Sequence, residues 1–395
     1  MSTGTVTVKL VLTEGMLAQP FGSRFKVGIR TTGFHDLMGA QATALKMHNT
    51  FLKPWLFSTV EDEYRSMTEV AVVIDVTGEE VIELRGEGAY ALVDRLVPRR
   101  LPPVFRARCS YTVMCYPYGG IVEDGIVIPF SDELVWWSGG PAQTEQWLYE
   151  HGLGTNVRVS SRLDEVHVLS VQGPESRRLL VDAGCFEAAE LGYFGLLAAT
   201  QVCGVPVTIT RTGYTAELGY DLYVERGLAH ELGERLLEVG APLGVRRCGS
   251  ATLEIRRVEA GILNVGQDFD WRHTPLECGL EWMVAFDKDF VGSAALQAQR
   301  AEGPPTALVG LVAEPGVVLV GGDGVLSSLG RVSGIVTSAV ASPTLGRHVA
   351  IARVMAGSVE QGDRVALEGC DGERRGGAQV CTFPFVDPER LRARA

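Results

Sequence analysis

The sequence lacks the short motifs by which several large enzyme classes are recognised. Its eight cysteines form no Cys-x-x-Cys pair, so neither a zinc-binding nor a dithiol redox motif is indicated. His-Glu-x-x-His is absent, which argues against a metalloprotease-type zinc site. Gly-x-x-x-x-Gly-Lys-Ser/Thr and a Gly-x-Gly-x-x-Gly turn after a strand are also missing, so the two common nucleotide-binding loops are not predicted.

Positive charge and long apolar runs are scarce as well. The 36 Lys and Arg against 48 Asp and Glu give a net charge of −12, so we expect no nucleic-acid partner, because phosphate binding needs clustered basic residues. No run of 18 apolar residues occurs, so we expect no membrane-spanning helix. Met1–Val6 lacks the charged and apolar regions of a secretory signal, which predicts a cytoplasmic protein with reduced cysteines.

What is present is ordinary globular composition over a long chain. The 395 residues are 46% hydrophobic and 21% charged, which suits two or three packed domains. Strand and helix patterns alternate until Phe290–Gly292. After the linker Gly303–Pro305, short β-rich runs separated by Gly and Pro favour a small barrel or sandwich. We therefore predict an α+β core over residues 1–300 and a β-rich domain over residues 301–395.

A strand that ends on glycine and leads into a helix occurs twice. The first unit runs through Val81–Gly86 and the second through Val168–Gly173. An internal duplication and two unrelated strand–helix units explain this pattern equally well. Further strands are predicted over residues 125–130, 134–138, 202–211 and 222–225, and helices over 59–70, 142–151, 229–239 and 250–260.

Two adjacent acids form the first candidate site. Glu123 and Asp124 follow an aromatic, glycine-rich stretch, Tyr116–Gly120, and precede a β-rich run. Neighbouring residues of an extended strand point to opposite faces. One carboxylate can therefore face a pocket and hold or accept a proton from a ligand amine, although a polar hairpin turn would give the same pattern.

The second candidate is the segment that ends on Asp221. Tyr214 can stack on a flat ring, and Gly213 and Gly219 allow a sharp turn or a close approach to a ligand. The Asp221 carboxylate can accept two hydrogen bonds from a heterocycle with adjacent N–H donors, such as a guanine or pterin edge. A surface β-turn is the alternative.

Three other features have structural explanations beside functional ones. Arg257 and Glu259, at the end of a predicted helix, more often form structural ion pairs than catalytic ones. In the strand that contains Trp136 and Trp137, one ring should face the core and the other a groove. His48 is a lone histidine, for which a structural role is the default and a substrate contact the alternative.

Seven segments occur in an order that resembles the folate-dependent aminomethyltransferases, the family of the glycine cleavage T-protein. The resemblance runs from about residue 60 to about residue 385. The segments are Gly119–Asp124, Val171–Ser176, Arg211–Tyr220, Arg257–Gly261, Thr274–Leu280, Phe290–Gly292 and Ser342–Gly346.

The resemblance implies a three-domain cloverleaf with a C-terminal β-barrel around tetrahydrofolate, and one-carbon transfer to N5 of that cofactor. It implies that Asp124 lies near N5, that Asp221 holds the pterin edge and that Tyr214 lies beside them. Tyr111 and Met114 match a stretch that lines the same space. We also expect Glu123 and Trp137 at the cofactor and His48 at the substrate, and we expect no metal.

The chain departs from the T-protein pattern in ways that point to a branch. Ala216 stands where the family usually has glycine, and the N-terminal Gly-Trp-x-x-Pro segment is absent. Instead, Met47–Pro54, Glu61–Tyr64 and Ile74–Glu79 are similar to the tetrahydrofolate-dependent demethylases of dimethylsulfoniopropionate and aryl ethers.

We therefore predict methyl transfer from a small O- or S-methyl donor to tetrahydrofolate, with Asp124 and Tyr214 as catalytic residues, in a monomer or homodimer. The alternatives are a glycine-cleavage-type aminomethyltransferase, a biosynthetic one-carbon transferase and a non-catalytic folate-binding protein.

Overall fold

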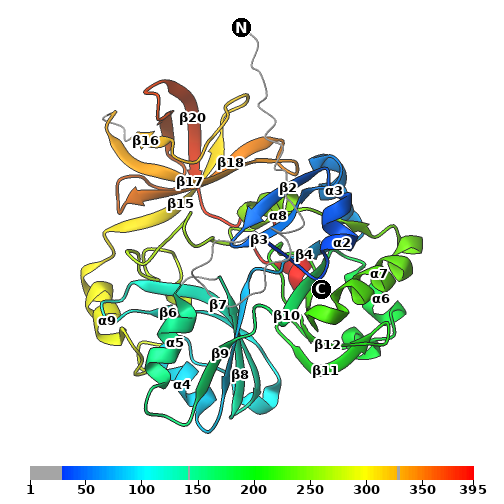
Figure 1. Ribbon diagram of the computed structural model, residues 1–395. Coiled ribbons are helices and arrows are strands. Elements are labelled where there is room, and N and C mark those ends of the chain that lie inside the picture. The colour runs from blue at the N-terminus through cyan, green and yellow to red at the C-terminus, as the bar shows by residue number, and fades with distance from the viewer. Residues whose placement is uncertain (1–28, 141–142, 327–329) are drawn as a thin grey trace.

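The protein folds into three lobes around a common centre (Figure 1). The computed structural model describes residues 29–140, 143–326 and 330–395. Met1–Val6, on which the expectation about a secretory signal rests, lies outside these residues. Within the described segments, no helix combines the length and apolar character that crossing a membrane requires. The predicted α+β architecture with a C-terminal β-barrel is confirmed.

The first lobe is built on a six-stranded sheet with the order β11-β12-β13-β10-β4-β14. Helices of this lobe bury their apolar faces in one core with the sheet. Its elements are β4 (Val72–Asp75), β10 (Val166–Gln172), α6 (Ser176–Asp182), β11 (Leu196–Val202), β12 (Val205–Thr210), β13 (Gly219–Glu225), α7 (Ala229–Gly240) and β14 (Arg246–Arg247).

One strand prediction in this lobe is wrong. The run over residues 202–211 is not one strand, because β11 and β12 form a hairpin whose two turn residues are Cys203 and Gly204. Both have positive φ, 52° and 78°. The apolar run hid this turn, because a two-residue hairpin needs two positive φ values and Cys-Gly is an uncommon way to supply them.

The second lobe is built on a five-stranded antiparallel sheet with the order β6-β7-β8-β5-β9. The chain enters it after β4 and leaves it before β10, so the first lobe combines segments distant in sequence. Its elements are β5 (Glu80–Arg85), α4 (Ala89–Leu96), β6 (Ser110–Cys115), β7 (Ile121–Ser131), β8 (Leu134–Gly139), α5 (Thr144–Gly152) and β9 (Arg158–Ser161).

The two strand–glycine–helix units lie in different lobes, and their glycines have nearly the same backbone conformation. Gly86 follows β5 with φ 129°, and Gly173 follows β10 with φ 130°. A Cβ atom on Gly86 would lie 2.0 Å from the backbone oxygen of Asn156, and one on Gly173 would lie 2.7 Å from backbone atoms of the first lobe. Both positions therefore need glycine for φ and for space.

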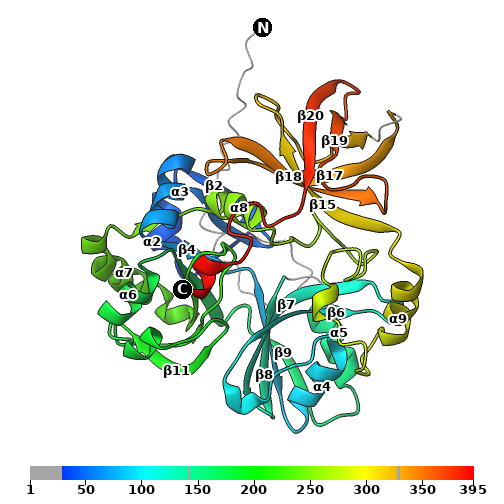
Figure 2. The same ribbon diagram turned by 180° about the vertical axis from the view of Figure 1, so that it is seen from behind.

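The third lobe is a closed six-stranded barrel with its own apolar core. Its strands are β15 (Thr306–Ala313), β16 (Gly324–Leu326), β17 (Val332–Ser342), β18 (Arg347–Met355), β19 (Arg364–Glu368) and β20 (Arg374–Cys381). They fall inside the predicted 301–395 segment, and the exact domain boundary stays a prediction. After β20 the chain leaves the barrel and ends in α10 (Leu391–Arg394) against the first lobe (Figure 2).

The remaining elements join the lobes. Helix α8 (Ser250–Glu259) contacts α3 (Val60–Glu69), the strand β3 (Phe51–Leu56) and two barrel strands, so it lies where the lobes meet. The other elements are β1 (Arg30–Thr31), α2 (His35–Met38), β2 (Ala44–His48) and α9 (Ser293–Glu302).

Candidate functional site

Strand alternation brings Asp124 and Asp221 onto facing surfaces of two sheets. On β7, Asp124 shares a face with Ile126 and Ile128, and on β13, Asp221 shares a face with Tyr223. Ile128 and Tyr223 belong to one apolar cluster that packs the two sheets together. Each carboxylate therefore extends the inner face of its own sheet beyond this cluster.

The hydrogen bonds that Asp124 makes offset the effect of its burial on its pKa only in part. The hydroxyl of Tyr111 donates to Asp124 Oδ2 over 2.9 Å. Burial raises the pKa of Asp124 to about 7, and the charge of Glu79 adds to the shift, while the Tyr111 bond opposes it. Near neutral pH this carboxyl group can therefore both hold and accept a proton.

Tyr111 is held as a donor. Burial, followed by the charge of Asp124, keeps the pKa of Tyr111 well above its usual value. Arg99 Nη1 donates to the Tyr111 carbonyl oxygen over 2.7 Å and fixes the strand at this point. Because the phenol keeps its proton, it stabilises the ionised form of Asp124.

Asp221 accepts two short hydrogen bonds. Ser170 Oγ donates to Oδ1 and Thr212 Oγ1 to Oδ2, both over 2.6 Å. Burial raises the pKa of Asp221, and the two hydroxyl groups oppose that rise. Each carboxylate oxygen has a further lone pair, so the side chain can still accept hydrogen bonds from a ligand.

Tyr214 lies near Asp124 and Tyr111. Its pKa is raised well above the usual value, first by burial and also by the charge of Asp124, with Arg257 opposing. Its hydroxyl donates to the Leu263 carbonyl oxygen over 2.7 Å. The phenol is therefore protonated and already bonded in this structure.

Glu79 is the site residue that motif reasoning missed. Its charge raises the pKa of Asp124, Asp221 and Tyr214, so all four groups lie around one region. Glu79 lies where the chain crosses from β4 of the first lobe to β5 of the second. That position is visible only once the strands are paired, because nothing in the local sequence marks the crossing.

His48 contacts Glu79 rather than either aspartate. His48 Nε2 lies 3.1 Å from Glu79 Oε1. Burial raises the pKa of Glu79, but the His48 hydrogen bond and neighbouring positive charge lower it by more. His48 therefore borders the site through Glu79, and its role towards a substrate stays a prediction.

The structure does not bring three other predicted residues to the surface that Asp124 occupies. Met114, Glu123 and Trp137 share the opposite face of the second-lobe sheet and are fully buried. Met114 and Trp137 belong to the core of that lobe. A contact between them and a cofactor stays a prediction, and Trp136 is the half-buried ring of the pair, bonded to Glu83.

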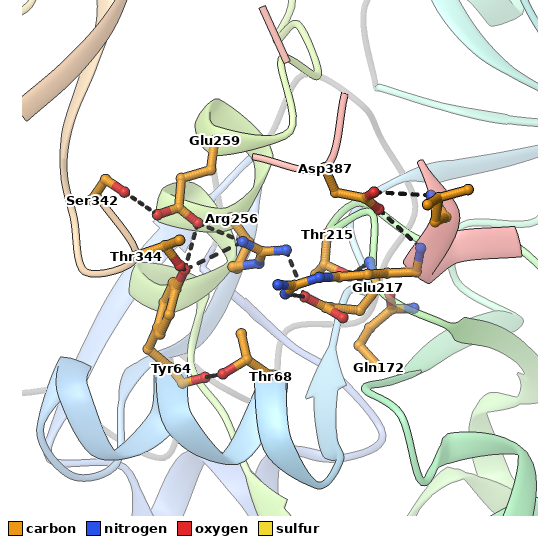
Figure 3. Close-up of polar contacts among 12 residues, drawn as sticks. Tyr64, Thr68, Gln172, Thr215, Glu217, Arg256, Glu259, Ser342, Thr344 and Asp387 are labelled. Carbon is orange, nitrogen blue, oxygen red and sulfur yellow. Dashed lines mark hydrogen bonds and ion pairs between the residues drawn. The ribbon is translucent and has the colours of Figure 1, made fainter. Parts of the chain in front are cut away.

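The arginines near the end of α8 form structural ion pairs. Arg256 lies between Glu217 and Glu259, at 2.6 Å and 2.5 Å (Figure 3). Tyr64 donates to Glu259 over 2.7 Å. Arg257 pairs with Asp268 over 2.7 Å. These buried pairs tie α8 to the segment that carries Tyr214 and Asp221, which is the structural alternative weighed for Arg257 and Glu259.

The donor set fits tetrahydrofolate. A pterin edge presents adjacent N–H groups, and Asp221 offers two carboxylate oxygens with free lone pairs. Asp124 has the pKa expected of a group that exchanges a proton near pH 7. In the described part of the chain, no three His, Cys, Asp or Glu side chains are grouped so as to hold a metal ion.

Comparisons with known families match almost the whole described chain. Residues 34–288 match the GCVT N-terminal domain, and residues 307–387 match the glycine cleavage T-protein C-terminal barrel domain. The solved aminomethyltransferase T of the glycine cleavage system from Bartonella henselae has the same fold, with a TM-score of 0.83 at 23% identity over 91% of this chain and 99% of that one.

Curated relatives carry two kinds of name. A trimethylamine-oxide aldolase from Ruegeria pomeroyi is 35% identical over 93% of this chain, which spans 48% of that longer protein. An aminomethyltransferase from Xanthomonas axonopodis pv. citri is 33% identical over 82% of this chain and 88% of its own length. An aminomethyltransferase from Bacillus pumilus is 30% identical over 84% of this chain and 92% of its own length.

Proposed function

The chain belongs to the glycine cleavage T-protein family of aminomethyltransferases, and on that premise we propose that it moves a methyl group from a small O- or S-methyl donor to N5 of tetrahydrofolate. Enzymes of this family are one-carbon transferases that use tetrahydrofolate. The bound cofactor supplies a nucleophilic nitrogen that accepts the one-carbon unit.

The observation that carries the proposal is the Tyr111–Asp124 pair. A carboxyl group whose pKa is about 7 can take up, at neutral pH, the proton released when a secondary amine is methylated. The Tyr111 hydroxyl holds Asp124 Oδ2 in place over 2.9 Å. Asp124 therefore both orients the reacting N–H group and receives its proton.

The cofactor is bound by the side of the site that carries Asp221. Asp221 receives the pterin N–H groups, and Tyr214 borders the ring. Holding the acceptor in line with the methyl carbon at near-attack distance supplies much of the rate acceleration in such transfers. Because Asp221 and Asp124 come from different lobes, the relative placement of the lobes sets where N5 lies with respect to Asp124.

The two donor types ask different things of the chain. An ether oxygen needs a proton or a hydrogen bond as it leaves, and Tyr111 or Tyr214 can supply it by turning its hydroxyl away from Asp124 or from the Leu263 carbonyl oxygen. A sulfonium leaves as a neutral thioether and needs neither. Similarity to the demethylase branch in Met47–Pro54 and Glu61–Tyr64 supports a methyl donor.

The direct test compares Asp124→Asn with Asp132→Asn, a matched change in an exposed turn of the same lobe. Tetrahydrofolate methylation is assayed with aryl methyl ethers, methyl sulfonium compounds and N-methyl amines. We expect Asp124→Asn to lower kcat by about 10²–10⁴-fold while tetrahydrofolate binding persists, and Asp132→Asn to match the wild type. Wild-type turnover in Asp124→Asn would refute the assignment.

A second candidate is transfer of an aminomethyl group from a carrier. The Xanthomonas and Bacillus relatives, which are named aminomethyltransferases and align over more than four fifths of this chain, favour it. Formation of methylenetetrahydrofolate from an aminomethylated carrier, with no turnover of any methyl donor, would select this candidate. Binding of tetrahydrofolate without turnover of either kind would select a non-catalytic role.

A further inference from the structure

We propose that hydrogen bonds from Gln172 to Ser170 and from Thr210 to Thr212 fix the direction of two hydroxyl groups, so that both donate to Asp221 and hold it ionised and oriented. The inference rests on the proposed function, which gives Asp221 the pterin edge. It adds positioning residues that touch neither donor nor cofactor.

The two hydroxyl groups are those of Ser170 and Thr212, and each bonds a different oxygen of the Asp221 carboxylate. Ser170 is the register partner of Asp221 between β10 and β13, and Thr210 is its partner between β12 and β13. Ser170 Oγ bonds Asp221 Oδ1, and Thr212 Oγ1 bonds Oδ2, each over 2.6 Å. A hydroxyl can point either way, so its neighbours decide whether it donates here.

Gln172 fixes the direction at Ser170. Its side chain is completely buried. One end of its amide lies 2.8 Å from Ser170 Oγ and 3.3 Å from the Thr212 carbonyl oxygen. A carbonyl oxygen only accepts, so this end of the amide is the NH₂ group. Its other end accepts from Thr215 Oγ1 over 2.6 Å.

Each hydroxyl therefore has its hydrogen left for Asp221. Ser170 accepts from the Gln172 NH₂ group and donates its single hydrogen to the carboxylate. Thr212 lies 2.6 Å from Thr210 Oγ1. An ionised carboxylate only accepts, so the Thr212 hydrogen lies on Asp221 and Thr210 is the donor of that pair. All of these bonds run towards Asp221, which favours its charged form.

Two glycines of the same segment make room for Gln172. A Cβ atom on Gly213 or on Gly219 would lie 2.3 Å from the Gln172 amide. Neither glycine has a left-handed backbone. The sequence suggested that these glycines allow a sharp turn or a close approach to a ligand. In the structure they are small because the amide that orders the hydrogen bonds lies against both.

The end of this hydrogen-bond chain that lies away from Asp221, at Thr215, is anchored by nearby ion pairs. Thr215 and Gln172 lie beside Glu217 in Figure 3, where Arg256 holds the Glu217 carboxylate over 2.6 Å. Arg392 holds it from the C-terminal segment over 2.9 Å. The acceptor side of Gln172 is thereby fixed to α8.

The main test removes the hydroxyl donor of Thr212 and keeps the shape of the side chain. Thr212→Val deletes the hydroxyl, and Thr212→Ser retains it as the matched control. Tetrahydrofolate affinity is measured by titration calorimetry between pH 5 and pH 9. We expect Thr212→Val to bind about 10-fold more weakly at pH 7 and to lose affinity at a pH about one unit higher than the wild type as the pH falls. Thr212→Ser should match the wild type.

Gln172→Met tests the chain one step further away. It keeps the length of the side chain but leaves Ser170 without its donor, so we expect the same upward shift in pH with a smaller change in affinity. It also decides the question if Thr212→Val fails to fold. Unchanged affinity in these variants, or weaker binding with the wild-type pH dependence, would overturn the proposal.

Asp221→Asn separates this inference from the proposed function. If Asp221→Asn weakens binding while Thr212→Val and Gln172→Met do not, the hydrogen-bond chain is refuted and the pterin assignment stands. If Asp221→Asn binds tetrahydrofolate as tightly as the wild type, the assignment of Asp221 fails, and the inference fails with it.

Discussion

The two aspartates of the site are buried to a similar extent but supported very differently. Asp221 accepts two hydroxyl donors at 2.6 Å. Asp124 accepts one phenol at 2.9 Å, and its pKa rises to about 7, with burial as the main cause and the Glu79 charge adding to it. The difference separates a carboxylate suited to binding from one suited to proton exchange.

The contrast follows from the neighbours that each strand provides. Asp221 lies in the middle of the first-lobe sheet, with Ser170 and Thr210 opposite it on both sides. Asp124 has the apolar Val113 opposite it on β6, and a hydroxyl donor reaches it from Tyr111, two residues further along that strand. Burial raises both pKa values, and hydrogen bonds to each carboxylate oppose that rise.

The largest expected effect is a split between kcat and binding. Asp124→Asn should lower kcat by about 10²–10⁴-fold with tetrahydrofolate affinity retained. Asp221→Asn should weaken tetrahydrofolate affinity by at least about 10-fold, because an amide cannot accept the same pair of N–H bonds without a repulsive contact, and kcat at saturation should change little. Equal effects of both variants on kcat would remove the distinction.

Arg256→Met should destabilise the buried ion-pair cluster that anchors the Asp221 side of the site. It leaves Glu217 and Glu259 buried with less opposing charge, which costs about 3–5 kcal/mol in comparable cases. Denaturant unfolding measures the loss, and Arg235→Met, at an exposed i,i+4 pair on α7, is the control. Loss below 1 kcal/mol would contradict the structural role of this cluster.

Tyr111→Phe should show whether Asp124 is the group whose titration controls the rate. Its hydrogen bond lowers the pKa of Asp124, so its removal raises that pKa above about 7. With Asp124 as the base, the rate rises with pH as the carboxyl ionises. The rising limb of kcat/KM should therefore move to higher pH, with several-fold slower turnover at pH 7 and recovery near pH 9. A profile with the wild-type midpoint would exclude Asp124 as the titrating group.

Asp124→Asn should make the folded protein more stable at pH values at which the wild-type Asp124 is ionised. The folded pKa of about 7 exceeds the unfolded value of about 3.9, so the folded state binds the proton more tightly. Stability from this group is present below pH 4 and is lost as the pH rises towards 7. Compared with the wild type, the variant should melt at a higher temperature at pH 8, and the difference should shrink at pH 5. Asp132→Asn should show neither effect.

Ala216→Gly should have the smallest effect. Ala216 has φ 56°, a left-handed conformation that costs a residue with a side chain about 1–2 kcal/mol. Glycine removes this cost but adds flexibility to the unfolded chain, so we expect a net gain of about 0.5–1 kcal/mol in urea unfolding. Ala183→Gly, at a position with φ −80°, should destabilise instead.

Much of the fold was predictable because its signals are local. Period-two and helical patterns gave β8, α7 and α8 almost to the residue. The β11–β12 hairpin was missed because its turn is made by Cys203 and Gly204 in an apolar run. The strand β16 was also missed, since three residues are too few for a pattern to be visible.

The site divides in the same way. Asp124, Tyr214 and Asp221 lie in motifs with recognisable composition, and the structure brings them around one region. Glu79 lies at a crossing between sheets, and Gln172 acts through an amide that packs against Gly213 and Gly219. Their positions depend on strand pairing between segments that are distant in the chain.

The sequence by itself determined the family, the secondary structure of most of the chain, the C-terminal barrel and the identity of the two acids. Those properties depend on the order and spacing of nearby residues. Only the tertiary structure decided which donors surround each carboxylate and that the pKa of Asp124 rises to about 7. A pKa depends on burial and on the donors that neighbouring strands bring within about 3 Å, and for Asp221 those donors come from Ser170 and Thr212, on different strands and loops.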